Sequence, residues 1–160
     1  GARVIGTVGS AAKGDSAKSY GCDYTFTYDQ NDFFSSVNDI TAGKGVDIVY
    51  DSVGAKTFDS SLSILASLGH LVNFGQSSGP VEPLAISRLA EKSLTLTRPI
   101  LFHYLADNHA YHLMAKSALE ALENGMFILP DLRCVPLRDA AFAHDQMQLG
   151  QGGGSLYLSP

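Results

Sequence analysis

The stretch "GKGVDIVYDSVG", residues 43 to 54, decides the fold class. Its middle is a run of β-branched and aromatic residues between glycines, which predicts a buried strand over 46–54. Glycine and serine at the end of such a run predict a tight turn that leads into a helix. The stretch therefore predicts one strand-to-helix step of an alternating fold.

The same alternation continues on both sides of this stretch. Strands are predicted at 4–8, 24–28, 46–54, 70–75, 94–97 and 155–158, an extended edge segment at 127–137, and helices at 15–20, 33–40, 57–66, 84–91, 108–124 and 138–149. Strands that alternate with helices through short connections predict βαβ units, so we expect an α/β fold with a doubly wound parallel sheet. A boundary near Gly125 is predicted to separate residues 1–125 from a segment at 126–160, where Pro130 and Pro136 argue against a central strand.

Composition limits the classes of partner. The chain has 160 residues, of which 45% are hydrophobic, enough for one domain with a core, and its net charge of −5 argues against nucleic acid as a partner. Cys22 and Cys134 are far apart and form no CxxC pair, so we expect neither a disulfide framework nor a zinc site, and a reducing, cytoplasmic setting. No apolar run approaches the ~20 residues that span a bilayer, so no membrane segment is expected.

Four predicted strands are followed by small, polar or glycine-rich turns. These turns read "GSAAK", "DSVG", "FGQSSG" and "TRP". Ligands of doubly wound sheets bind outside the carboxyl ends of the strands, and backbone N–H groups of such turns can approach phosphate. Together the turns predict a nucleotide cofactor, although the conformational needs of Gly and Ser explain any one of them alone.

The turn at residues 9–13 bears on which cofactor is bound. If the strand before it is the second of a dinucleotide fold, an Asp or Glu at its end normally binds the ribose hydroxyls and repels a 2′-phosphate. Here the strand ends at Gly9 and Ser10, and Lys13 follows, which favours NADP over NAD. The alternative for Lys13 is an ordinary solvated lysine at a helix start. No G-x-G-x-x-G turn opens a helix in this sequence, so we expect the fold to lack its first strand.

Four stretches of the sequence carry a family resemblance: "GARVIGTVGSAAK", "GKGVDIVYDSVG", "LVNFGQSSGP" and "LTLTRP". Their order and spacing resemble the quinone oxidoreductase (zeta-crystallin-like) branch of the medium-chain dehydrogenase/reductase superfamily. The resemblance covers essentially all 160 residues. It implies the carboxyl-terminal half of an enzyme about twice as long, with a partial Rossmann-type domain that binds NADP. It also implies hydride transfer from NADPH to a quinone or another electron-poor carbonyl.

The resemblance also implies roles for individual residues. Lys13 and Tyr28 would flank the 2′-phosphorylated ribose, beside Ser10. The remaining implied cofactor contacts are Val53 and Gly54 on the adenosine side, Phe74, Gly75 and Ser77 near the pyrophosphate and the nicotinamide ribose, and Arg98 at the nicotinamide end. Gly150 stands where relatives often carry a further arginine contact. No catalytic residue is named, because the catalytic domain would lie outside these residues, and the chain alone is expected not to turn over substrate.

Two further expectations concern assembly and metals. The resemblance implies a homodimer that pairs the strand at 94–97 with its copy across a two-fold axis. His109 and His112 lack a third ligand at suitable spacing, so no metal is expected. Asp47 and Asp51 lie on one face of a strand with Val49 between them, which predicts no acid–base pair. The alternative functions are an enoyl-thioester reductase of the same superfamily and a non-enzymatic module, either crystallin-like or nucleotide-binding.

Overall fold

The structure is a computed structural model that describes residues 1–27, 33–127, 132–149 and 155–160. These residues form two compact units, Gly1–Ala110 and Tyr111–Pro160. Across the described ranges, no helix is long and apolar enough to cross a membrane. The domain boundary predicted near Gly125 stays a prediction.

The first unit contains two parallel sheets. One pairs β1 (Ile5–Val8) with β2 (Tyr24–Thr27), and the other has the order β3 (Val46–Asp51), β4 (Leu65–Asn73), β5 (Thr95–Thr97). The helices between these strands are α1 (Ala11–Ser19), α2 (Phe33–Ile40), α3 (Phe58–Ser63) and α4 (Ser87–Ala90), and α5 (Leu101–Tyr104) follows β5. Every described strand pair is parallel, which confirms the predicted α/β class. Among the described residues, β1–β2 and β3–β4–β5 are separate sheets.

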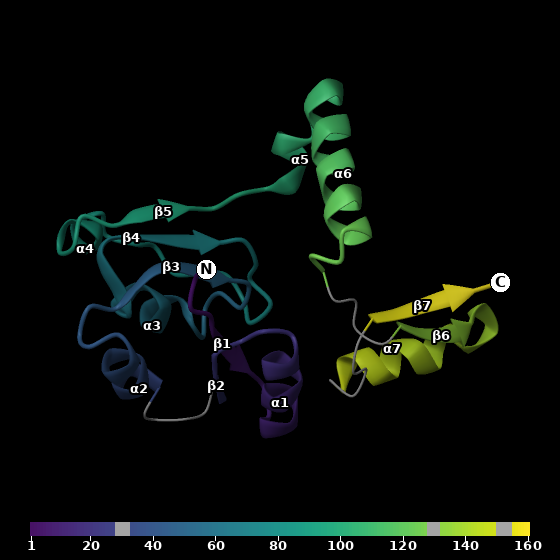
Figure 1. The fold of residues 1–160 in the computed structure, drawn as a ribbon, viewed down its shortest axis with the longest axis horizontal. Helices are drawn as coiled ribbons and strands as arrows, with labels where there is room; N and C mark the ends of the chain where they lie inside the picture. The colour runs from purple at the N-terminus through teal and green to yellow at the C-terminus, as the bar shows by residue number, and fades with distance from the viewer. Residues whose placement is uncertain (28–32, 128–131, 150–154) are drawn as a thin grey trace. The chain divides into compact units, whose positions relative to one another are not determined.

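The core of the first unit lies between α3 and one face of the β3–β4–β5 sheet (Figure 1). Phe58 and Leu62 from α3 meet Leu65 and Leu71 from β4, and all four side chains are at most 5% exposed. Partly buried side chains surround this cluster: Val46, Val49, Val81, Leu84, Leu89, Leu94 and Leu96.

The opposite face of the same sheet is open within the described unit. Ile48 and Tyr50, which alternate with Val49 along β3, are 51% and 71% exposed. Side chains of a strand alternate between the two faces, which places Ile48 and Tyr50 opposite Val49. Val46 packs against the same core as Val49, and the pairing register shifts between Val46 and Ile48.

Three predicted helices have different bounds in the structure. The helix predicted at 15–20 begins earlier, at Ala11, because Ser10 is its N-cap and accepts a hydrogen bond from the Lys13 amide (3.4 Å). The helix predicted at 57–66 is wrong at its end. Leu65 belongs to β4, since the Ile64 carbonyl accepts a hydrogen bond from the Val46 amide (2.9 Å) at the start of the strand pairing.

The helix predicted at 84–91 contracts to Ser87–Ala90. Leu84 packs against the core from outside that helix.

The second unit contains most of α6 (Asn108–Glu123), which ends before Gly125 (φ +68°) and agrees closely with the predicted helix at 108–124. It continues with β6 (Leu132–Pro136), the 3₁₀ turn η1 (Leu137–Asp139), α7 (Ala140–Gln148) and β7 (Ser155–Ser159). β6 and β7 pair in parallel as a two-stranded sheet joined through α7. Pro136 is the last residue of β6.

Candidate functional site

Two turns meet at the carboxyl edge of the β3–β4–β5 sheet. Asp51 and Asn73, the last residues of β3 and β4, are register partners. The turns that follow them carry five of the residues implied as cofactor contacts: Val53, Gly54, Phe74, Gly75 and Ser77. Parallel pairing therefore brings together two motifs that lie about twenty residues apart in the sequence.

Hydrogen bonds join the two turns directly. The Ser77 amide donates to the Ser52 carbonyl (3.2 Å), and the Ser78 amide and hydroxyl both donate to the Val53 carbonyl (2.8 and 2.7 Å). In the return direction, the Lys56 amide donates to the Ser78 hydroxyl oxygen (3.0 Å). The turns are therefore joined by hydrogen bonds into one surface, residues 52–54 and 74–78, which we call the ledge. Ser78 contributes to it although the sequence predicted no role for that residue.

Two glycines allow this close approach. A Cβ atom on Gly75 would lie 2.5 Å from the Ser52 carbonyl oxygen, and one on Gly54 would lie 2.8 Å from the Gly79 carbonyl oxygen. Gly54 also has a φ of +85°, which side chains other than glycine adopt at a cost. Sterics thus require glycine at two positions where the resemblance implied cofactor contacts.

The buried Asp51 carboxylate is hydrogen-bonded to the turn after β3. Asp51 is 4% exposed, and its Oδ1 accepts hydrogen bonds from the amides of Val53 (2.8 Å) and Gly54 (3.1 Å). The Thr57 hydroxyl lies 2.9 and 3.0 Å from the two carboxylate oxygens, and the Ser61 hydroxyl donates to Oδ2 (3.0 Å). Asp47, on the same strand, is exposed. The sequence analysis did not predict the Asp51 network.

Arg98 lies one residue beyond β5, whose last described pair is Val72 with Thr97. That position continues the edge formed by the two turns. The Arg98 side chain is exposed, and its Nη1 donates to the neighbouring Pro99 carbonyl (3.1 Å). The third turn at this edge is therefore the one predicted from "TRP".

Ser10 and Lys13 lie at the start of α1, the helix that connects the two strands of the separate β1–β2 sheet. Ser10 caps α1, and Lys13 is exposed in the first turn of that helix. None of the hydrogen bonds and ion pairs of the described ranges joins either residue to the turns after β3 and β4. Tyr28 and Gly150 lie outside the described residues.

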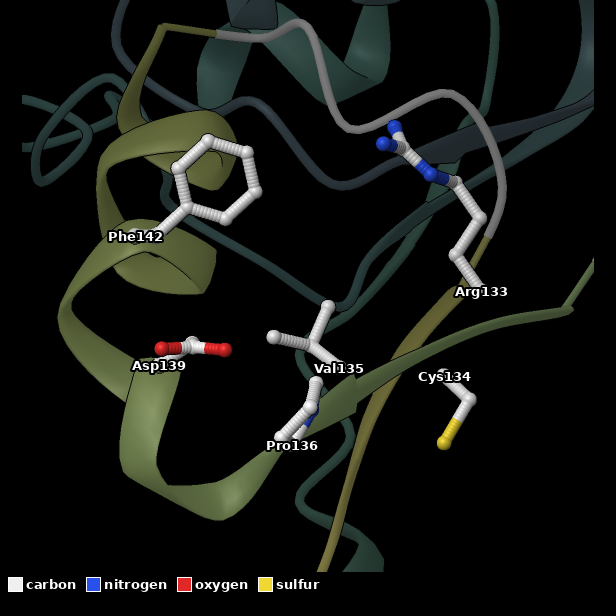
Figure 2. A pocket seen from close by; sticks show the side chains of 6 residues that line it. All are labelled: Arg133, Cys134, Val135, Pro136, Asp139 and Phe142. Atoms are coloured by element: carbon white, nitrogen blue, oxygen red, sulfur yellow. The ribbon is translucent and has the colours of Figure 1, made fainter.

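The described residues contain a further hollow and no cluster of metal-ligating side chains. Across the described part of the chain, no group of three or more His, Cys, Asp or Glu side chains could hold a metal ion. A hollow in the second unit is lined by residues of β6, η1 and α7: Arg133, Cys134, Val135, Pro136, Asp139 and Phe142. In Figure 2 Val135 points toward α7, whereas Cys134 points away, and no predicted cofactor residue lines this hollow.

Comparisons with known proteins give the family. Residues 1–122 match the family described as zinc-binding dehydrogenase. The chain is 38% identical over its whole length to a 2-haloacrylate reductase from a Burkholderia species, covering 49% of that protein, and 36% identical to quinone oxidoreductase 1 of Escherichia coli, covering 50%. The crystal structure of an Escherichia coli quinone oxidoreductase complexed with NADPH matches 100% of the chain and 50% of its own, with a TM-score of 0.90 and 35% identity.

The chain spans about half the length of these relatives. The predicted resemblance is confirmed, because both the family and its quinone oxidoreductase members match across the chain. The chain therefore belongs to the zinc-binding dehydrogenase family, in the quinone oxidoreductase branch of the medium-chain dehydrogenase/reductase superfamily.

Proposed function

We propose that this chain is the NADP-binding part of an oxidoreductase that transfers hydride from NADPH to a quinone or another electron-poor carbonyl. One observation carries the proposal: the turns after β3 and β4 form a hydrogen-bonded ledge at the carboxyl edge of a parallel sheet, where such folds bind nucleotides. Relatives named quinone oxidoreductase and a related structure that contains NADPH support it.

The proposed roles follow the arrangement of the turns. Lys13, with Ser10 and Tyr28, would bind the 2′-phosphorylated ribose. Val53 and Gly54 would contact the adenosine side, Phe74, Gly75 and Ser77 the pyrophosphate and the nicotinamide ribose, and Arg98 the nicotinamide end. Bound NADPH supplies the hydride, and the contribution of this chain is to orient the cofactor and exclude water. The proposal assigns residues 126–160 to contacts with a catalytic domain outside this chain.

A titration monitored by ¹H–¹⁵N NMR tests cofactor binding, because it detects weak complexes. We expect NADPH to shift the amide signals of residues 9–13, 52–54 and 74–77, and NADH to bind less tightly. Equal binding of the two cofactors, or shifts confined to the second unit, would contradict the proposed site.

Lys13 gives a sharper test of the preference for NADPH. Lys13→Ala removes a cation that would pair with the 2′-phosphate, so we expect about tenfold weaker NADPH binding and unchanged NADH binding. Lys18→Ala is the matched control, because Lys18 is an exposed lysine of the same helix. Equal losses of affinity for NADPH and NADH in Lys13→Ala would show that the lysine does not contact the 2′-phosphate.

A second candidate is a reductase of an electron-poor carbon–carbon double bond, the class that includes enoyl-thioester reductases. The 38% identity to a 2-haloacrylate reductase favours this candidate. Rates with a benzoquinone and with a 2-haloacrylate, measured on the protein encoded by the complete reading frame, distinguish the two. Cofactor binding without either reaction would favour the nucleotide-binding module instead.

We also propose that β5 pairs with its copy in a homodimer. β5 is an edge strand of the β3–β4–β5 sheet, and edge strands of this kind need cover. Thr95→Lys, at the exposed residue of β5, is expected to weaken the dimer in light-scattering chromatography. A wild-type protein that elutes strictly as a monomer would contradict the proposal.

A further inference from the structure

We infer that Asp51 is a positioning residue for the proposed cofactor site, because its carboxylate fixes the turn after β3 and its main-chain carbonyl fixes the turn after β4. The inference rests on the proposed function, since the two turns are the surface that would contact NADPH. Asp51 itself would not touch the cofactor.

The Asp51 side chain is buried, with no cation of the described residues paired to it. A buried carboxylate is costly unless hydrogen bonds or a cation stabilise it. Asp51 is 4% exposed, and the ion pairs found among the described residues, Arg88–Asp59, Lys116–Glu120 and Arg138–Asp139, do not include it. Its stabilisation comes from hydrogen bonds, which are strong because the acceptor is charged.

The hydrogen bonds to the Asp51 carboxylate come from the turn and the helix that follow it. Oδ1 accepts from the Val53 and Gly54 amides, and both oxygens lie within 3.0 Å of the Thr57 hydroxyl. Ser61 occupies Oδ2. Both carboxylate oxygens thus accept hydrogen bonds from the turn and the helix that follow Asp51. These bonds fix the backbone conformation of residues 52–54.

The backbone of Asp51 is also hydrogen-bonded to the turn after β4. The main-chain carbonyl of Asp51 accepts hydrogen bonds from the Phe74 amide (2.9 Å) and the Gly75 amide (3.3 Å). Asn73, its 2%-exposed register partner, donates from Nδ2 to the Gly75 carbonyl (3.2 Å). A displacement at the end of β3 would therefore move both turns, and small displacements of a binding surface are enough to weaken orientation.

Four variants separate positioning from general stability. Asp51→Ala removes every acceptor of the carboxylate, and Asp51→Asn keeps one carbonyl oxygen for the Val53 and Gly54 amides. Ser61→Ala removes one hydrogen bond to Oδ2 but leaves both turn amides bonded. Asp47→Ala is the matched control, because Asp47 is an exposed aspartate on the same strand.

Dissociation constants for NADPH and thermal unfolding midpoints are measured for all four variants and for the wild-type chain. We expect affinity to fall about tenfold or more in Asp51→Ala and within about threefold in Asp51→Asn, because one carbonyl restores the turn bonds. Ser61→Ala is expected to lower the midpoint with unchanged affinity, and Asp47→Ala to change neither. This pattern would support the inference, because affinity follows the turn bonds and not stability.

Three results would overturn the inference. They are wild-type NADPH affinity in Asp51→Ala, an equal loss of affinity in Ser61→Ala, and, if Asp51→Ala does not fold, a loss of affinity of about tenfold in Asp51→Asn while the amide signals of Val53 and Gly54 stay unmoved. A wild-type chain that binds no NADPH would reject the proposed function and this role together. That outcome is recognised before any variant is compared, so it is distinct from a failure of the inference alone.

Discussion

Gly75→Ala tests the close contact that holds the two turns together. Gly75 does not have a positive φ, so the substitution adds only a methyl group and no backbone strain. That methyl carbon would lie 2.5 Å from the Ser52 carbonyl oxygen and 2.9 Å from the Ser52 Cα atom. Both are backbone atoms, so relief requires the turns to separate by roughly 1 Å to reach ordinary contact distance.

The size of the effect follows from the bonds that such a separation breaks. A shift of about 1 Å takes the bond from the Ser78 amide to the Val53 carbonyl, now 2.8 Å, and the bond from Ser77 to Ser52, now 3.2 Å, outside hydrogen-bond range. With about 1 kcal/mol for each of the two bonds and overpacking strain of about 1–3 kcal/mol, we expect a loss of about 3–5 kcal/mol in the free energy of unfolding.

Urea unfolding followed by circular dichroism measures this loss. Gly9→Ala is the matched control: Gly9 has no positive φ, and no atom lies within 4 Å of its added Cβ, so its free energy of unfolding should stay within about 0.5 kcal/mol of wild type. A Gly75→Ala chain that unfolds at the same urea concentration as wild type would refute the argument that the two turns form one ledge.

Further predictions concern the core, a surface pair and a titrating tyrosine. Leu71→Ala, at a fully buried position, should lower the free energy of unfolding by about 2–5 kcal/mol in the same urea experiment. Arg88→Ala should change it by less than about 1 kcal/mol, because the partner Asp59 is largely exposed. A hydrogen bond with Cys134, and then its charge, raise the pKa of the Tyr157 phenol. Cys134→Ala should therefore lower the Tyr157 pKa in a ¹³C NMR titration, and an unchanged value would contradict the proximity of the two side chains.

The sequence predicted the alternating fold because its signals are local. Strand β3 and its turn are marked by β-branched residues followed by glycine, and Gly125 marks the end of α6. The helix predicted at 57–66 was too long for a physical reason. Phe58, Leu62 and Leu65 have helical spacing, but Leu65 reaches the same core from the start of a strand. Apolar spacing alone does not distinguish these two ways of entering a core.

The Asp51 network could not be predicted in the same way. Its hydroxyl donors, Thr57 and Ser61, lie six and ten residues further along the chain, and only the turn and α3 bring them back to the carboxylate. A polar residue at the end of a strand is ordinarily solvated. A signal was nevertheless present, since an aspartate followed by Thr and Ser at the start of a helix offers a carboxylate and donors to the same turn.

The distribution of buried side chains has a consequence for local unfolding. The four core side chains Phe58, Leu62, Leu65 and Leu71 lie between residues 58 and 71, whereas the 16-residue helix α6 contains no buried residue. An isolated helix of that length is only marginally stable in water. Amide hydrogens of β4 should therefore exchange with solvent only when the first unit unfolds as a whole, and those of α6 through local opening at much lower free energy. The described residues thus include a cooperative folding segment centred on β4 and a helix, α6, that contributes no side chain to a buried core.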